Sequence, residues 1–421
     1  MRVLIVSQYF APEMTAAANR LHAFAAGLVG RGHEVEVVCE VPHHPVGVVA
    51  KGYGGRLVDR REMDGATVRY VWVHLASSKD SRGSRLANYV SFGFTGTIVA
   101  CATRRPDVIL ASSPPLPVGG VGLAVAARQR RPWVMDVRDL WPDAAVALGQ
   151  VVDGPLLRAA QRFERCLYRS AAAITVTTVP SGRLVETRGG AGKVAVVPNG
   201  TTAEFLEAGA RAPTKGVLGD RDDLFRWTYA GNLGMVAGLE TAIDAARELG
   251  EGFQLVLIGD GSRRNDLERL TSDLPSDQVV FHDAVPPTEA AELMRASDAL
   301  LASRAPAPEL DGMVLSKLYD CCAVGRPVIV SAAGETSRLA TEAAAGLSIR
   351  PGNAGELASA VRRIRDDDGL RERLATGARA FGEANAREGG VAELERVLRG
   401  VVEAHPARTR RLRQGQGAKE A

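Results

Sequence analysis

The chain has 421 residues, 46% of them hydrophobic and 24% charged, with a formal net charge of +3. This balance is typical of a globular protein of about two or three domains, and it excludes a wholly disordered chain. The near-neutral charge argues against a nucleic-acid-binding protein. The five cysteines have no paired metal-binding spacing and are too sparse for a disulfide-stapled scaffold, so we expect reduced thiols.

The N-terminal residues 1–7 read as a first strand and not as a signal peptide. No apolar stretch reaches the roughly 18 residues that a transmembrane helix needs. These two features favour a cytoplasmic protein.

Short β-branched runs alternate with longer helical patterns, which indicates parallel sheets with helices on both faces. In the first half we expect strands at 2–7, 35–39, 67–73, 107–111, 133–136, 172–176 and 194–197. The helices between them are expected at 16–30, 84–103, 117–129, 154–170 and 180–188. In the second half we expect strands at 226–230, 254–258, 279–281, 299–302, 327–330 and 347–349. Its helices are expected at 238–249, 263–273, 288–295, 314–324, 335–343 and 354–367, with further helices from 370 to 404.

These two series predict an α/β fold class with two Rossmann-like, parallel-sheet domains that face each other across a cleft. We expect an N-terminal domain at 1–200, a linker at 201–224 and a C-terminal domain at 225–385. A last helix at about 386–404 is expected to pack back on the N-terminal domain. The tail at 405–421 is basic, and both a solvated end and a contact with anionic lipid stay open for it.

The sequence lacks the motifs of dinucleotide-binding and metal-binding proteins. The turn after the first strand, residues 7–14, has no glycine, whereas a dinucleotide-binding fold needs a glycine-rich turn there. The acidic runs at 220–222 and 366–368 read as solvated charge and not as metal ligands. We therefore expect no NAD, FAD or other cofactor and no metal site.

Two segments of the second half favour a phosphate site. Small residues at 231–234 close a strand just before a helix, where backbone N–H groups can hold a phosphate. Farther on, Gly312 opens a helix that carries Lys317 and, at i+3, Asp320. The lysine suits a pyrophosphate and the carboxylate suits ribose hydroxyls. A tight turn and an ordinary core helix are the structural alternatives.

Together, these segments resemble the family 4 retaining glycosyltransferases, which adopt the GT-B fold. The similarity covers about residues 1–400 and is closest to the bacterial N-acetyl-fucosamine transferases of surface-polysaccharide assembly. Its marks lie at 7–13, 31–35, 136–143, 231–234, 259–261, 316–320 and 325–329.

The resemblance implies transfer of a sugar from a nucleotide-diphosphate sugar, with retention of anomeric configuration and without a metal. A UDP-sugar is the favoured donor, and the acceptor is either lipid-linked, in surface-polysaccharide assembly, or a secondary-metabolite core. By resemblance, the donor would lie on the C-terminal domain against Gly231, Asn232, Gly234, Gly259, Asp260, Gly261, His282, Gly312, Met313, Ser316, Lys317 and Asp320. Lys317 would neutralise the diphosphate, whose charge grows as the glycosidic bond breaks, and Asp320 would hold the ribose.

The sequence also departs from the family. Asp320 stands where the family usually has a glutamate, and residues 235–238 lack the lysine or arginine that often follows the glycine turn. Residues 15–18 replace a glycine pair of the family, which stiffens that loop. Three arginines are candidates to supply the missing positive charge: Arg263, Arg264 and Arg304.

Charged residues of the first half are expected on the acceptor side. Asp136, Arg138 and Asp139 lie at the carboxyl end of an apolar strand. We expect these three residues, together with Lys317 of the second half, to be catalytic. A structural ion pair is the alternative for this trio. Glu13 and His44 are further acceptor-side candidates on loops.

Residues 79–105 join basic ends to an apolar and aromatic middle, a pattern that suits a helix lying in a membrane interface. A buried helix packed on the first sheet is the alternative. An interfacial helix would bring the protein to the inner face of the cell membrane, where a lipid-linked acceptor is reached.

Two other functions stay open. A GT-B nucleotide-sugar epimerase shares the fold and the donor pocket but needs no acceptor site. A catalytically silent relative would act as a binding partner, an option kept open by the Asp320 exchange and by the missing basic residue after Gly234. The donor sugar, its nucleotide base and the acceptor do not follow from the sequence.

Overall fold

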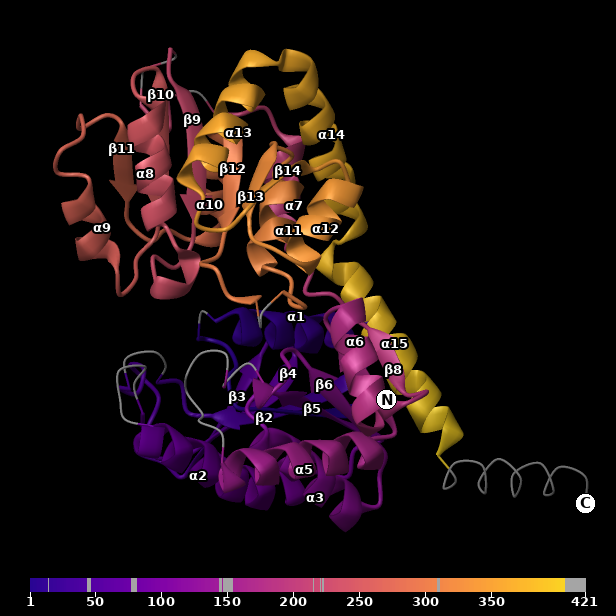
Figure 1. Cartoon of the computed structure of the whole chain (residues 1–421). Coiled ribbons are helices and arrows are strands. Elements are labelled where there is room, and N and C mark those ends of the chain that lie inside the picture. The colour runs from indigo at the N-terminus through magenta and orange to yellow at the C-terminus, as the bar shows by residue number, and fades with distance from the viewer. Residues whose placement is uncertain are drawn as a thin grey trace, which may run out of the picture. The chain divides into compact units, whose positions relative to one another are not determined.

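The computed structural model describes residues 1–13, 15–43, 47–76, 82–143, 146, 154–214, 216–219, 221, 223–308 and 311–405. The chain divides into two compact units. Unit 1 is Met1–Pro198 together with Gly390–Ala421, and unit 2 is Asn199–Gly389. Each unit is a sheet covered by helices on both faces (Figure 1).

The sheet of unit 1 is almost entirely parallel. Its strands are β1 (Arg2–Ser7), β2 (Glu34–Glu40), β3 (Val58–Met63), β4 (Ala66–Val71), β5 (Val108–Ser113), β6 (Trp133–Val137), β7 (Ala173–Val176) and β8 (Val194–Val196). Within the described residues their order is β3-β4-β2-β1-β5-β6-β7-β8. Among the strands that the structure describes in this unit, only β3 pairs antiparallel, with β4. The β3–β4 turn is built on Asp64 and Gly65, which both take positive φ as two-residue hairpin turns require.

The helices of unit 1 cover both faces of this sheet. They are α1 (Ala16–Gly30), α2 (Arg82–Cys101), α3 (Pro117–Gln129), α5 (Pro155–Ser170), α6 (Val179–Val185), the π-turn η1 (Glu186–Gly190) and α15 (Arg387–Ala404) from Gly390 onward. Side chains alternate along a strand, so β1 contributes to two cores. Val3 packs with Leu21 of α1 and Leu394 of α15, whereas Leu4 packs on the opposite face with Phe92 of α2.

Unit 2 has a parallel sheet within its described residues, in the order β11-β10-β9-β12-β13-β14. These strands are β9 (Phe225–Ala230), β10 (Phe253–Ile258), β11 (Val279–His282), β12 (Ala299–Ser303), β13 (Val328–Ser331) and β14 (Gly346–Ile349). The helices are α7 (Ala203–Ala210), the 3-10 turn η2 (Met235–Ala237), α8 (Glu240–Leu249), α9 (Arg264–Leu270), α10 (Pro287–Ala296), α11 (Ser316–Ala323), α12 (Glu335–Glu342), α13 (Ala354–Asp366) and α14 (Asp368–Ala384).

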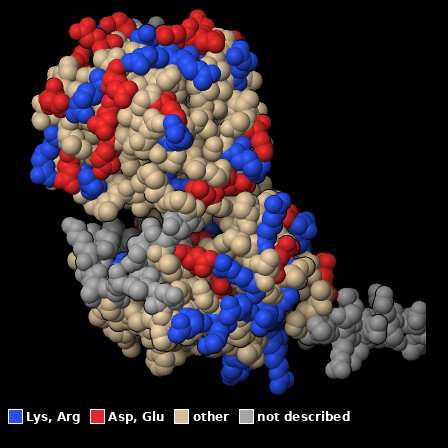
Figure 2. All heavy atoms as spheres, in the orientation of Figure 1, with Lys and Arg blue, Asp and Glu red and all other residues tan. Residues whose placement is uncertain are grey.

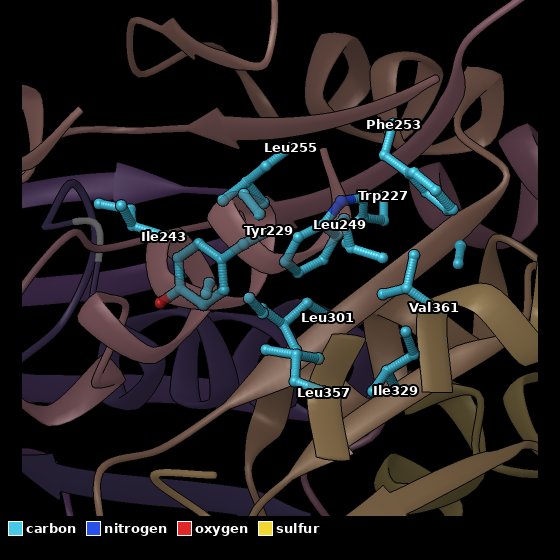
Figure 3. Close-up of a cluster of buried hydrophobic side chains, with 14 of the residues drawn as sticks. Trp227, Tyr229, Ile243, Leu249, Phe253, Leu255, Leu301, Ile329, Leu357 and Val361 are labelled. Atoms are coloured by element: carbon cyan, nitrogen blue, oxygen red, sulfur yellow. The ribbon is translucent and has the colours of Figure 1, made fainter. Parts of the chain in front are cut away.

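The largest core of unit 2 lies between its sheet and helices α8 and α13. Trp227 and Leu255 of the sheet pack there with Ile243 of α8 and Val361 of α13 (Figure 3). The opposite face packs on α10 and α11, for example through Leu318 of α11. Because the sheet is covered on both faces, its strands are nearly continuous apolar runs.

The predicted α/β class with two parallel-sheet units is confirmed, but two local predictions are wrong. The strand β3 was not expected, because its four inner residues, 59–62, are all charged and give no apolar signal. The predicted linker at 201–224 contains a helix, α7, whose Phe205 packs against a buried core. Gly209 lets α7 approach α11 closely, since a Cβ there would overlap the carbonyl oxygen of Ala323.

Among the helices within the residue ranges given above, none combines the length and the apolar character required to cross a bilayer.

Candidate functional site

Two glycine-rich turns of unit 2 lie side by side at the carboxyl ends of β9 and β10. The turn 231–234 follows β9, and the turn 259–261 follows β10, its parallel neighbour. Their backbones are joined directly: the Gly231 N–H donates to Ile258 O at 2.8 Å, and the Leu233 N–H donates to Asp260 O at 2.9 Å. Ligands of parallel α/β sheets bind at this kind of edge.

The closeness of these turns requires glycine. A Cβ on Gly259 would overlap the carbonyl oxygen of Gly231, and a Cβ on Gly261 would overlap the side chain of Asn232. Gly231 itself has a φ of 140°, which other residues rarely adopt, and its missing Cβ leaves the space that the Lys317 ammonium occupies. The sequence predicts Gly231 and Lys317 at one site, and the structure places them in contact.

Lys317, in the first turn of α11, is the positive charge at this turn. Its Nζ lies 4.9 Å from the ring centroid of Tyr229, and the Tyr229 hydroxyl donates to Asn232 O at 2.9 Å. Burial lowers the pKa of Lys317, although Asp320 acts in the opposite direction. An ammonium with little water around it gains most from a bound anion.

The segment before α11 is fixed by the start of α12. The Leu315 N–H donates to Thr336 Oγ1 at 3.1 Å, and that hydroxyl donates to Met313 O at 3.2 Å. Gly334 approaches so closely that a Cβ would overlap Asp311 O. Gly312 and Met313 therefore belong to a braced loop, and Ser316 is the first residue of α11.

Asp320 already has partners within unit 2. Thr201 Oγ1 donates to Asp320 Oδ1 at 3.0 Å. Burial raises the pKa of Asp320 to about 6, against the opposing effects of the Thr201 hydrogen bond and the Arg387 charge. Part of this carboxylate is thus engaged by residues that the sequence analysis did not single out.

The three arginines considered as replacements for the missing positive charge are all engaged in ion pairs. Arg263 pairs with Glu240 at 2.8 Å, Arg264 pairs with Asp283 at 2.9 Å and Arg304 pairs with Asp311 at 3.3 Å. Their charges are neutralised locally, so Lys317 carries the positive charge at the glycine turn.

Two further residues expected at the donor site, His282 and Asp260, hold the loops that follow β11 and β10. His282 O accepts the Gly259 N–H at 3.0 Å and Arg264 Nη1 at 3.3 Å. Asp260 Oδ1 accepts the Gly261 N–H at 2.7 Å. These residues hold the backbone that follows β10 and β11.

In unit 1, Asp136 forms a buried ion pair. Its carboxylate is fully buried and accepts hydrogen bonds from Arg20 at 3.0 Å, Ser112 at 2.7 Å and Thr175 at 2.8 Å. Burial alone would raise the pKa of Asp136, but the charge and hydrogen bond of Arg20 outweigh it and hold the pKa below its ordinary value. Of the two predicted alternatives, this geometry favours the structural ion pair over a catalytic role for Asp136.

Arg138 and Asp139 follow β6 and stay partly exposed. The Arg138 guanidinium donates to Pro114 O, and its backbone N–H donates to Ser113 O at 2.9 Å. Burial raises the pKa of Asp139, with the Arg138 charge acting against it. These two residues are therefore the better candidates in unit 1 for contact with a substrate.

The acceptor-side residue Glu13 is buried, and His44 lies outside the described residues. Glu13 Oε1 accepts the His43 N–H at 2.9 Å. Glu40, the last residue of β2, lies close to Glu13 and His43 and was not identified from the sequence. The available signal was an acidic residue directly after the apolar run 37–39 at the carboxyl end of β2.

Two protein families match the chain. Residues 15–200 match the glycosyl transferase 4-like domain, and residues 213–381 match the glycosyl transferases group 1. An Escherichia coli (strain K12) protein named as a colanic acid biosynthesis glycosyl transferase, WcaI, is 25% identical over 353 residues, which cover 80% of this chain and 84% of that protein. Alpha-D-kanosaminyltransferase of Streptomyces kanamyceticus is 32% identical over 160 residues, or 36% of this chain and 39% of the relative.

Solved structures show the same fold. Sucrose-phosphate synthase from Thermosynechococcus elongatus has a TM-score of 0.73 at 17% identity and covers 96% of this chain and 99% of its own. Anabaena HepE, solved in complex with UDP-glucose, has a TM-score of 0.68 at 17% identity. The match covers 95% of this chain and 100% of the HepE chain. The two parallel α/β units thus define a GT-B fold.

The chain is therefore a glycosyltransferase. It is built from a 4-like domain followed by a group 1 domain, and its relatives include a glycosyl transferase of polysaccharide biosynthesis. The expected N-acetyl-fucosamine transferase subgroup finds no confirmation among these relatives.

Proposed function

We propose that this glycosyltransferase moves a sugar from a nucleotide-diphosphate sugar, most favourably a UDP-sugar, to an acceptor hydroxyl with retention of anomeric configuration. The observation that carries the proposal is the Lys317 ammonium, desolvated and lodged against Gly231. A diphosphate at this turn gains charge as the glycosidic bond breaks, and a preorganised cation stabilises that charge more than the ground state.

The comparisons support the choice of donor and acceptor. HepE was solved with UDP-glucose, which favours a uridine donor here. WcaI is named for colanic acid biosynthesis and the Streptomyces relative for transfer of kanosamine. The acceptor is accordingly a saccharide, either a lipid-linked precursor of a surface polysaccharide or a secondary-metabolite core.

Each unit contributes a separate part of the reaction in this proposal. In unit 2, Lys317 and the turns at 231–234 and 259–261 bind the diphosphate without a metal ion. Asp320 contacts the ribose with the carboxylate oxygen that Thr201 leaves open. In unit 1, Arg138 and Asp139 orient the acceptor hydroxyl, and Asp136 holds β6 in place through its ion pair.

The first test removes the lysine. We expect Lys317→Ala to weaken binding of UDP-glucose at least tenfold, because removing a charged partner of a phosphate costs about 1.5–3 kcal/mol. Isothermal titration calorimetry with UDP-glucose and with UDP measures the affinities. Lys193→Ala, which removes a partly exposed lysine of unit 1, is the matched control. Equal affinities of the Lys317→Ala protein and the wild type would refute the proposed site.

We further propose that α2 contacts the membrane surface. Its apolar side chains at every fourth position form one exposed stripe: Leu86 (48% exposed), Val90 (58%), Phe94 (69%) and Ile98 (55%). Spacing of four residues places side chains on one helix face. This stripe favours the interfacial alternative over a fully buried helix.

The positive charge of α2 and of the neighbouring helices α3 and α5 fits an anionic lipid surface. Helices α2, α3 and α5 carry several arginines, and their one acidic residue, Glu164, is buried. Figure 2 shows basic side chains gathered toward the lower edge of unit 1, the edge that α3 and α5 form in Figure 1. Apolar insertion together with basic side chains is the usual combination in interfacial binding.

A further inference from the structure

A buried group of ligand-type side chains lies in unit 1 and contains none of the donor residues named above. Glu13 follows β1, Glu40 ends β2 and His43 comes three residues later, so all three lie at the carboxyl ends of two adjacent parallel strands. They are only 6%, 2% and 4% exposed. One ligand atom from each lies within 4.8 Å of the other two.

Two buried acceptor oxygens accompany this group. Glu40 Oε1 and Gln8 Oε1 are both buried without a hydrogen-bond donor, and Glu40 Oε1 lies 3.8 Å from His43 Nδ1, beyond hydrogen-bond distance. The Gln8 side chain is fully buried and lies against the Glu40 carboxyl, whose other oxygen accepts Asn88 Nδ2 at 3.2 Å. An unpaired buried acceptor costs about 1–3 kcal/mol, so two together indicate a missing positive partner.

His43 is oriented as a metal-binding histidine. Its Nδ1 lies 2.9 Å from Val41 O, and because a carbonyl only accepts, Nδ1 carries the proton. The lone pair is then on Nε2, whose neighbour Asn88 Nδ2 is 3.5 Å away, too far for a strong hydrogen bond. A ring N–H bound to a backbone carbonyl is the arrangement that fixes metal-ligating histidines.

The charge balance points in the same direction. The Glu13 and Glu40 carboxyl groups are both buried, and one oxygen of each belongs to the same 4.8 Å group. A cation that contacts both carboxylates would stabilise the pair in this buried position. A proton would satisfy one oxygen, whereas a divalent cation could bind one ligand atom from each of Glu13, Glu40 and His43.

We propose that Glu13, Glu40 and His43 bind one divalent cation of the Zn²⁺ or Mn²⁺ class, with Gln8 Oε1 as a fourth ligand. Imidazole nitrogen with carboxylate and amide oxygens is a donor set that these ions accept. The ion would tie the loop after β1 to the loop after β2. It replaces the expectation of no metal for unit 1 and leaves the diphosphate chemistry of unit 2 unchanged.

The test loads the purified full chain with metal. After treatment with a chelator, the protein is dialysed against Zn²⁺ or Mn²⁺ and its metal content is measured by plasma mass spectrometry. We expect about one equivalent and a melting temperature about 5–10 °C higher at a hundredfold excess over Kd. With Co²⁺ as the probe, the visible spectrum should carry a band that His43→Ala abolishes.

Conservative variants separate this site from surface binding. Glu13→Gln and Glu40→Gln keep the side-chain shape. Each variant should lose the bound equivalent of metal and the rise in melting temperature that metal causes. Glu164→Gln, an equally buried glutamate of unit 1 that bonds Tyr168, should keep both. The proposal is overturned if the wild type binds no more metal than Glu40→Gln does. It is also overturned if the metal-free wild type becomes more stable as the pH falls while metal has no effect, since the pair would then share a proton.

Discussion

Single residues of unit 2 show where sequence reasoning is strong and where it ends. The turn glycines and Lys317 stand in short motifs, so their proximity could be predicted from the strand ends that they follow. The bond from Thr201 to Asp320 joins residues 119 positions apart. No local pattern signals it, because it depends on where the chain enters unit 2.

The carboxylate of Asp320 makes stability depend on pH. Its pKa in the folded chain is about 6, above the ordinary 3.8, mainly because of burial. Folding therefore favours the protonated form: this contribution is full below pH 4 and is lost as the pH rises through 6. Asp320→Asn removes the charge and keeps an acceptor for Thr201.

We therefore expect Asp320→Asn to be more stable than the wild type by about 1–3 kcal/mol at pH 8, and equally stable below pH 4. Calorimetric melting temperatures from pH 4 to pH 8 measure the difference. Asp366→Asn, at the exposed end of α13, should follow the wild type throughout. Parallel pH profiles of wild type and Asp320→Asn would show that burial does not perturb this group.

At the scale of elements, Arg20 joins three parts of unit 1. From α1 its guanidinium reaches Asp136 of β6 at 3.0 Å, Val197 O at 2.9 Å and Pro198 O at 2.9 Å. The side chain is 1% exposed. An arginine in the interior of a helix gives no sign in the sequence of such a role, so this link could not be predicted.

Removing Arg20 should be costly. Arg20→Ala leaves the Asp136 charge buried without its partner, which typically costs about 3–5 kcal/mol. For a unit of this size we expect the melting temperature to fall by about 10 °C. Arg31→Ala, which removes a partly exposed pair with Glu395 at 3.4 Å, should change it by less than about 2 °C. Similar small losses in both variants would contradict the structural role of the ion pair.

A separate prediction concerns the binding of α2 to lipid vesicles. The double variant Phe94→Ser with Ile98→Ser removes two exposed apolar side chains, each worth about 1.5–3 kcal/mol when buried. We expect at least a tenfold loss of binding to phosphatidylglycerol-rich vesicles in a flotation assay. Leu57→Ser, at a residue that is 77% exposed just before β3, should bind as the wild type does. Unchanged flotation of the double variant would exclude α2 as the contact.

Most elements were predictable because buried parallel strands leave a clear apolar signal. β1, β5 and β10 are such strands, and their ends were expected to within one or two residues. β3 and α7 were missed for opposite reasons. β3 is a polar edge strand without that signal, and α7 lies in a glycine- and proline-containing stretch that resembles a linker.

At the scale of the whole molecule, two alternating series gave the fold class, and the motifs at their strand ends gave the chemistry. The buried group of Glu13, Glu40 and His43 was not foreseen as a unit. Its members lie in separate loops, and only the pairing of β1 with β2 brings them together.

The central claim, that this chain binds a nucleotide-diphosphate sugar, is tested most directly by a thermal-shift screen against UDP-, GDP-, dTDP- and CMP-sugars. A ligand at a hundred times its Kd adds about 2.7 kcal/mol to stability, which is a shift of several degrees. We predict a clear shift with a UDP-sugar and little with the others. No shift with any of the four would contradict the donor site and leave the glycine turn and Lys317 without their proposed ligand.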